Sequence, residues 1–196
     1  MTPAKRALDV VASLAGSLVL LPVFALIGAA IALDGGPVFF RQVRVGLGGR
    51  EFRIWKFRTM IVNADRAGPL LTAAGDTRIT PVGRWLRRTK LDELPQLFNV
   101  VIGEMSLVGP RPEVARYVAM YTPQQRAVLN LVPGITDPAS LHYVDESALL
   151  ADSADAEQLY VNVLMPDKIR RNLDYAQHAT VLSDLRVIMQ TIRRVF

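Results

Sequence analysis

The longest hydrophobic pattern of the chain lies near its N-terminus. Residues 10–33 include no charged side chain and consist mainly of Leu, Val, Ala and Ile. As a helix, a segment of this length matches a hydrocarbon core about 30 Å thick. Pro22 lies in the middle of it, where proline removes a backbone donor and clashes with the preceding turn. We therefore predict two helices with a break at Pro22.

Basic residues flank this segment on both sides. Lys5 and Arg6 precede it, and Arg41 and Arg44 follow it, so the positive-inside rule favours neither orientation of a spanning helix. A re-entrant helix keeps both flanks on the cytoplasmic face, and we predict this arrangement for residues 1–36. A spanning helix and a cleaved signal peptide are the alternatives. Against the signal peptide, a Gly-Gly-Pro turn follows the segment in place of a small-residue cleavage site.

Alternating polar and apolar residues follow the membrane segment. Residues 38–45 are rich in β-branched and aromatic side chains, residues 51–58 alternate with period two, and a glycine-rich turn separates them. This pattern predicts a β-hairpin. The glycines of the turn do not form a GxGxxG fingerprint, so they indicate a turn and not a dinucleotide site.

Helical patterns dominate the rest of the chain. We predict a loop with a short helix over residues 63–76 and a helix from Pro112 to about Asn130. An amphipathic C-terminal helix, packed on the core or docked on the membrane surface, is predicted from apolar residues at helical spacing: Val181, Leu185, Ile188, Ile192 and Val195. The expected fold is α+β, with a re-entrant helix followed by a small mixed domain over residues 37–196 that has a β-hairpin and interfacial helices.

Composition narrows the chemistry. The 196 residues include no cysteine, which excludes disulfides and thiolate chemistry, and only two histidines. The net charge is +5 and the sequence pI is about 9.9, so an anionic partner is expected. The mean hydropathy of +0.23 reflects the N-terminal segment.

A basic stretch with a tryptophan precedes residue 90. Arginine and tryptophan together are typical of a nucleic-acid surface or of an amphipathic helix at a membrane interface, and the second fits a chain with a membrane segment. A membrane-anchored module that binds anionic lipid or nucleic acid is therefore one functional hypothesis. Its cations would be Arg78, Arg84, Arg87 and Arg88.

Two adjacent carboxylates, Asp92 and Glu93, follow this basic stretch. As structural residues, Asp92 would cap a helix and Glu93 would lie in its first turn. As functional residues, a carboxylate at a helix N-terminus keeps a low pKa and can act as a nucleophile. Its neighbour can hold Mg²⁺, which prefers oxygen ligands and substrate phosphates.

The chain resembles the bacterial sugar transferases, the monotopic polyprenyl-phosphate phosphoglycosyl transferases of the small type that has only the catalytic domain. Matching segments follow the family's order and cover most of the chain: residues 37–39, 56–60, 91–97, 99–100, 103–112 and 133–136. The family breaks its membrane helix at a Ser-Pro pair, whereas this chain has Leu21-Pro22. After Thr136 the chain continues with Asp137-Pro138 and not with the glycine found in many members, a difference that we expect to affect sugar selection.

The resemblance implies a two-step reaction. Asp92 would attack the β-phosphate of a nucleotide-diphosphate sugar, most often a UDP-sugar, and release the nucleoside monophosphate. Polyprenyl phosphate would then take the sugar phosphate from the phosphosugar–aspartyl intermediate, which begins the assembly of a bacterial glycan such as O-antigen, capsule or exopolysaccharide. Glu93 would bind Mg²⁺. The substrate-binding residues would be Lys56, Arg58, Arg87 and Arg111.

Location and partners follow from the same resemblance. The catalytic domain is expected on the cytoplasmic face of the bacterial inner membrane, in contact with membrane lipid and without a nucleic-acid partner; a homodimer remains open. A rival enzyme would transfer the sugar without its phosphate and release UDP instead of UMP. A second acid pair, Asp145-Glu146, has no matching basic cluster and is expected to be a solvated loop or a helix start.

Overall fold

Two helices joined at a sharp bend form the N-terminal part of the chain. The structure, a computed structural model, describes residues 1–64, 68 and 75–195. Helix α1 runs over Pro3–Val19 and α2 over Leu21–Leu33, and their axes bend by 61° at the break. Pro22 lies in the first turn of α2, where its missing N–H costs no helical hydrogen bond. The predicted break is confirmed.

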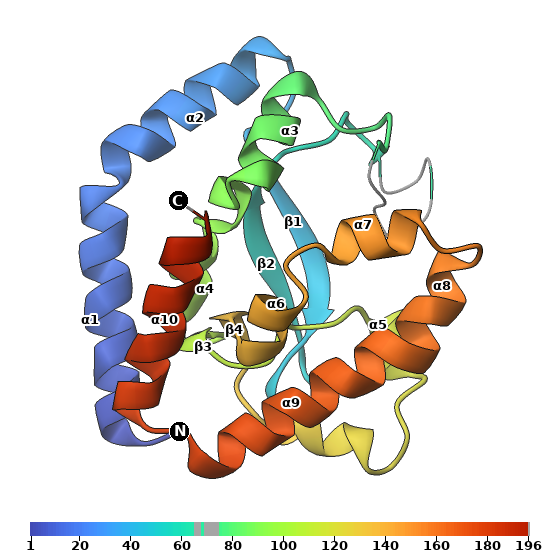
Figure 1. The fold of residues 1–196 in the computed structure, drawn as a ribbon. Coiled ribbons are helices and arrows are strands. Elements are labelled where there is room, and N and C mark those ends of the chain that lie inside the picture. The colour runs from blue at the N-terminus through green and yellow to red at the C-terminus, as the bar shows by residue number, and fades with distance from the viewer. Residues whose placement is uncertain (65–67, 69–74, 196) are drawn as a thin grey trace.

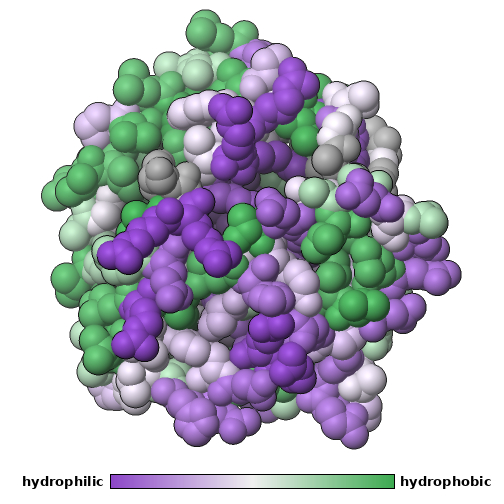
Figure 2. Space-filling model, in the orientation of Figure 1, coloured by the Kyte–Doolittle hydropathy of each residue, from purple (hydrophilic) through white to green (hydrophobic). Residues whose placement is uncertain are grey.

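Taken together, α1 and α2 have the length and composition of a membrane segment. Within the described ranges, no single helix is long and apolar enough to cross a membrane, and only this bent pair meets the criterion. The pair borders one side of the molecule (Figure 1), and hydrophobic surface covers that side (Figure 2). Length and composition do not distinguish a broken span from a re-entrant loop, so re-entrant insertion stays a prediction.

The inward face of α1 is polar, which reverses the usual pattern. Asp9 and Ser13 are fully buried, whereas Val11, Leu14 and Leu18 are exposed. The Asp9 carboxylate accepts hydrogen bonds from Lys5 Nζ (2.9 Å), Ser106 Oγ (2.8 Å) and the Leu107 amide (3.3 Å). Polar contacts thus fasten α1 to the domain, and its apolar residues face outward.

The predicted hairpin is present. Strands β1 (Phe39–Val45) and β2 (Glu51–Phe57) pair antiparallel, with Phe39 opposite Phe57 and Val45 opposite Glu51. A 3-10 turn, η1 (Leu47–Gly49), joins them, and Gly48 adopts a positive φ of 66° that favours glycine. A second sheet, which the alternation did not predict, pairs β3 (Ser106–Val108) parallel to β4 (Gly134–Thr136).

Short helices surround these strands in a mixed α+β fold (Figure 1). In chain order they are α3 (Pro81–Arg88), the 3-10 turn η3 (Leu91–Glu93), α4 (Gln96–Ile102), α5 (Ala115–Val118), the 3-10 turn η4 (Gln125–Asn130), α6 (Pro138–His142), α7 (Glu146–Ala151), α8 (Ala156–Leu159), the π-helical turn η5 (Tyr160–Leu164), α9 (Met165–His178) and α10 (Val181–Val195). The C-terminal helix is thereby confirmed. Its predicted residue Val195 ends α10.

The single helix predicted from Pro112 to about Asn130 is wrong. The chain forms α5 and then, after an interruption, η4. Pro123 accounts for the interruption, because it has no N–H to donate and disfavours helical backbone at Thr122. The loop with a short helix predicted over residues 63–76 lies largely outside the described residues.

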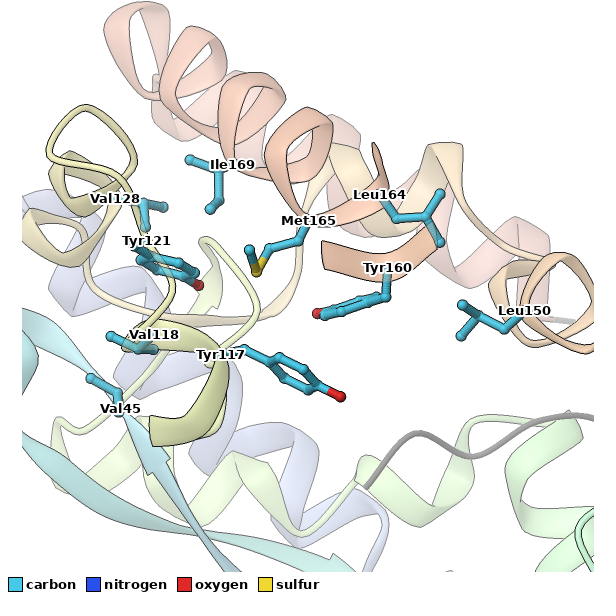
Figure 3. Packing of buried hydrophobic residues seen from close by; sticks show 10 residues of the cluster. All are labelled: Val45, Tyr117, Val118, Tyr121, Val128, Leu150, Tyr160, Leu164, Met165 and Ile169. Atoms are coloured by element: carbon cyan, nitrogen blue, oxygen red, sulfur yellow. The ribbon is translucent and has the colours of Figure 1, made fainter. Parts of the chain in front are cut away.

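Three hydrophobic clusters hold the elements together. The largest joins α5, η4, η5 and α9 around Tyr117, Tyr160 and Met165 (Figure 3). A second packs Phe24 and Ile31 of α2 against Phe57 and Leu86, so that α2 is part of the folded domain. Ile54, Val100 and Met105 form the third, which joins β2 to α4.

Candidate active site

The turn that carries Asp92 and Glu93 has helical backbone but is not a capped helix start. Lys90 precedes it with a left-handed φ of 54°, and Leu94 continues it with right-handed helical angles into α4. Asp92 lies inside η3 and caps no helix, so the helix-cap interpretation of Asp92 is wrong. The inward face of this stretch is buried, and it includes Asp92, Gln96 and Asn99.

Glu93 is held by two cations from different parts of the chain. Lys56 Nζ, from β2, donates to its Oε1 at 2.8 Å. Arg111, from the loop after β3, donates through Nη1 to Oε2 at 3.0 Å and through Nη2 to Oε1. Both carboxylate oxygens are therefore occupied, and three of the predicted site residues, Glu93, Lys56 and Arg111, lie in contact.

These contacts fix the charge of Glu93. Burial would raise its pKa, but the charges of Arg111 and Lys56 and their hydrogen bonds outweigh burial and hold the pKa of Glu93 well below its usual range. Burial lowers the pKa of Lys56, and the charge of Glu93 opposes that shift. Glu93 is ionised at neutral pH, as a metal-binding carboxylate must be.

Asp92 has the opposite surroundings. It is 7% exposed, and no group in the described part of the chain donates a hydrogen bond to its carboxylate. Burial raises the pKa of Asp92, the charge of Glu93 raises it further, and the charges of Lys56 and Arg87 oppose the rise. The low pKa expected from a helix N-terminus is therefore wrong, because burial dominates and α4 begins four residues later.

Arg87 reaches the acid pair from the end of α3. Its Nε donates to Thr59 Oγ1 at 2.9 Å, just beyond the end of β2. Burial lowers the pKa of Arg87, and the charge of Asp92 is the largest effect that opposes the shift. Arg87 is thus a cation beside Asp92. Thr59, which orients it, was not singled out from the sequence as a site residue.

Arg58 serves the fold at another place. Its guanidinium donates to the backbone carbonyls of Pro37 (2.8 Å), Ile31 (3.0 Å) and Gly35. The side chain is buried and closes the end of α2 against β2. These contacts give it a structural role, and they do not support the substrate role predicted for it.

The basic stretch divides into residues with different surroundings. Arg78 pairs with Asp76 at 2.6 Å, whereas Arg87 binds Thr59 and its charge acts on Asp92. Arg84 and Arg88 are exposed on α3. The four arginines proposed for a polyanion-binding surface therefore do not act as a single exposed patch.

A cavity of about 580 Å³ opens beside the acid pair. Glu93 and Arg111 line it, together with Tyr143, Glu146 and Lys168. The helix start predicted at Asp145-Glu146 is confirmed by α7, but Glu146 is not simply solvated: it binds Lys168 Nζ at 2.9 Å. Sequence reasoning missed Lys90, although it lies two positions before Asp92, and it missed Lys168 and Arg194 because nothing local relates positions so far apart.

The carboxylates suit a magnesium ion that arrives with its substrate. No group of three or more carboxylate or histidine side chains that could hold a metal occurs among the residues the structure describes. Mg²⁺ is commonly held by one or two carboxylates together with substrate phosphates. Glu93, which is ionised and next to Asp92, fits that pattern once Arg111 releases one of the two carboxylate oxygens of Glu93.

Comparisons with known proteins agree with these features. The family profile of the bacterial sugar transferases matches residues 1–196. A UDP-glucose:undecaprenyl-phosphate glucose-1-phosphate transferase of Caulobacter vibrioides is 38% identical over 192 residues, which cover 96% of this chain and 68% of that protein.

Two further relatives are longer. A UDP-N-acetylgalactosamine-undecaprenyl-phosphate N-acetylgalactosaminephosphotransferase of Aeromonas hydrophila is 34% identical, covering 97% of this chain and 43% of that protein. An undecaprenyl-phosphate glucose phosphotransferase of Komagataeibacter xylinus is 36% identical, covering 97% of this chain and 35% of that protein. The chain thus spans less than half of these two relatives. The match over its whole length shows that it is an enzyme of the bacterial sugar transferase family.

Proposed function

We propose that the chain transfers a sugar 1-phosphate from a UDP-sugar to polyprenyl phosphate through a phosphosugar intermediate on Asp92. The names of the relatives, which act on UDP-sugars or undecaprenyl phosphate, support the substrates. The contrast within the acid pair carries the mechanism: Glu93 is saturated by two cations, whereas Asp92 is buried and accepts no hydrogen bond within the described residues. A structural carboxylate would have donors, as Asp9 does.

The first step would form a bond between a carboxylate oxygen of Asp92 and the β-phosphorus of the UDP-sugar. The bond from that phosphorus to the bridging oxygen breaks, and the oxygen leaves with UMP. In the second step, a phosphate oxygen of the polyprenyl phosphate attacks the same phosphorus and the bond to Asp92 breaks. The products are the polyprenyl-diphosphate sugar and a restored Asp92 carboxylate.

The cations around the pair suit the negative charge of both steps. Arg87 lies where its charge acts on Asp92, and it would bind the oxygens of the phosphoryl group that forms there. Arg111 would exchange one oxygen of Glu93 for a substrate phosphate. Mg²⁺ held by Glu93 would neutralise charge on the diphosphate and its leaving oxygen. Lys56 would then keep Glu93 in place.

The N-terminal helices would hold this site at the level of the lipid headgroups. The outward apolar residues of α1 and α2 and the polar contacts of Asp9 with the domain support a re-entrant insertion with the domain on the cytoplasmic face of the inner membrane. There, a polyprenyl phosphate presents its phosphate beside the site. The search for the acceptor is thus confined to the membrane surface.

The nucleotide product tests this proposal. The purified chain in detergent or nanodiscs is incubated with a panel of UDP-sugars, Mg²⁺ and undecaprenyl phosphate. UMP formed together with a lipid-linked sugar diphosphate supports the proposal. UDP would indicate transfer of the sugar alone, and no turnover with any donor would favour a basic membrane-anchored binding module.

A further inference from the structure

Three further cations line the cavity that Glu93 and Arg111 line. Arg88 at the end of α3, Lys90 before η3 and Arg194 near the end of α10 all line it. The ends of α3 and α10 lie close together in Figure 1, and Figure 2 shows a hollow rimmed by hydrophilic surface on this face. We refer to these three residues as the basic entrance.

The three cations of the basic entrance lack acidic partners. None of them forms an ion pair with a carboxylate among the described residues, and Arg194 donates only to the backbone carbonyl of Leu141. By contrast, Arg111, Lys56 and Lys168 at the same cavity or beside it each bind a glutamate. Unpaired cations at a cavity mouth favour an anion from outside.

Lys90 is also held in an unfavourable backbone conformation. Its φ of 54° is left-handed, which costs energy for a residue with a long side chain. Such conformations persist where the surrounding structure imposes them, and they are common at functional sites. Here the residue in this conformation is a lysine that lies two residues before Asp92.

Apolar residues lead from outside the molecule to the basic entrance. On α10, a stripe of exposed apolar side chains runs along one face and ends at Ile192, which also lines the cavity. Inside the cavity, Leu91, Leu94 and Ile188 continue the apolar lining. We refer to the exposed residues as the α10 stripe: Leu182, Leu185, Met189 and Ile192.

An apolar path that ends at unpaired cations matches an amphipathic molecule with an anionic head. A nucleotide sugar is polar along its whole length and gains nothing from the α10 stripe. A polyprenyl phosphate has a hydrocarbon tail next to a phosphate monoester, in the same order as the stripe and the entrance.

We propose that the basic entrance and the α10 stripe bind the acceptor lipid, with the phosphate at Arg88, Lys90 and Arg194 and the first prenyl units along α10. The phosphate then lies in the cavity that is lined by Glu93, the chain neighbour of Asp92. This inference rests on the proposed function for the identity of the acceptor. The residues that it assigns to acceptor binding lie outside the motifs that the chain shares with its family.

The test separates the two half-reactions. A triple variant, Arg88→Gln, Lys90→Asn and Arg194→Gln, removes the charges, and asparagine tolerates the left-handed backbone at position 90. The KM for polyprenyl phosphate should rise about tenfold or more, because three cations that attract its anionic phosphate are removed. UMP release from the UDP-sugar without acceptor should keep its rate. Arg84→Gln with Arg193→Gln, two exposed arginines that do not line the cavity, is the matched control.

Two further arms identify the source of the anion. Farnesyl phosphate should compete with the long-chain acceptor, whereas inorganic phosphate at the same concentration should not. A photoreactive prenyl phosphate should label residues 182–192 in the wild type, less in the triple variant, and without any need for turnover. An unchanged acceptor KM, a slowed first half-reaction, equal competition by inorganic phosphate, or labelling elsewhere would overturn the inference. Absence of UMP in the wild type would instead contradict the proposed function.

Discussion

Asp92 and Glu93 are neighbours in the chain, yet their carboxylates are held in opposite ways. Glu93 accepts hydrogen bonds from Lys56 and Arg111, whereas Asp92, although the charges of both cations act on it, accepts none within the described residues. The pKa of Glu93 is accordingly lowered and that of Asp92 raised, with burial as the main cause of the second shift. The fold thus keeps one carboxylate fixed and the other available to react.

The two carboxylates should affect stability with opposite signs. Because the pKa of Asp92 is higher in the folded state than in the unfolded state, its stabilising contribution is present at low pH and is lost as pH rises through the folded pKa. Asp92→Asn should therefore raise Tm at neutral pH while turnover collapses. Glu93→Gln, the matched amide change, should lower Tm, because the ionised form of Glu93 is the stabilised one. Thermal unfolding of both variants decides; a loss of stability in Asp92→Asn would make Asp92 a structural residue.

Acid should inhibit the first half-reaction at a higher pH than for an ordinary aspartate. Only ionised Asp92 can attack, and its pKa lies above the usual 3.8. The charge of Arg87 lowers the pKa of Asp92, so Arg87→Gln should move the acid limb of UMP release to higher pH, whereas Arg87→Lys should move it less. The pH dependence of UMP release is the measurement, with Arg84→Gln as control. An acid limb that does not respond to Arg87→Gln would separate Arg87 from Asp92.

Arg58 should behave as a structural residue. Arg58→Ala removes three hydrogen bonds to backbone carbonyls around the end of α2, and a loss of about 3 kcal/mol or more in unfolding free energy is expected, since charged hydrogen bonds contribute about 1.5–3 kcal/mol each. The KM for the UDP-sugar should stay unchanged in the enzyme that folds. Arg53→Ala, at an exposed site of β2, the strand that precedes Arg58, controls for the loss of a cation. A normal Tm with a raised KM would restore Arg58 to substrate binding.

The bend between α1 and α2 should place both of its flanks on one side of the membrane. Single cysteines at Ala4 and Arg50, which are exposed, should both react with an impermeant thiol reagent from the cytoplasmic side, and a cysteine at Val19 near the bend should react from neither side. The chain has no cysteine of its own to compete. Labelling of residues 4 and 50 from opposite sides would instead establish a spanning helix.

The elements that were predicted correctly are those that residues close together in the sequence determine. Pro22 specified the break between α1 and α2, and the alternation of residues 51–58 specified β2. Even here tertiary contacts mattered, because Lys56 of β2 binds Glu93, which is 37 positions away in the sequence. The helix expected up to Asn130 is interrupted between α5 and η4, because Pro123 has no N–H to donate to a continuous helix.

Within the candidate site, residue types were predictable but their roles depended on burial. The sequence identified Asp92 and Glu93 as a pair. It could not show that Lys90 adopts a left-handed backbone before η3, so that Asp92 lies inside this turn and caps no helix. It could not distinguish Arg58 from Arg87 either: Arg58 donates to the backbone carbonyls around α2, whereas the charge of Arg87 acts on Asp92. Lys168 and Arg194 reach the cavity from two C-terminal helices, which no local pattern indicates.

The covalent intermediate is the central claim, and omission of the acceptor lipid tests it most directly. The full chain is incubated with Mg²⁺ and its UDP-sugar, quenched, and examined by intact-mass and peptide mass spectrometry, with Asp92→Asn alongside. The account predicts up to one equivalent of UMP per active site and a sugar-phosphate mass on the peptide that contains Asp92, both absent from the variant. UMP release that requires the lipid, or a sugar phosphate bound to any other residue, would contradict it.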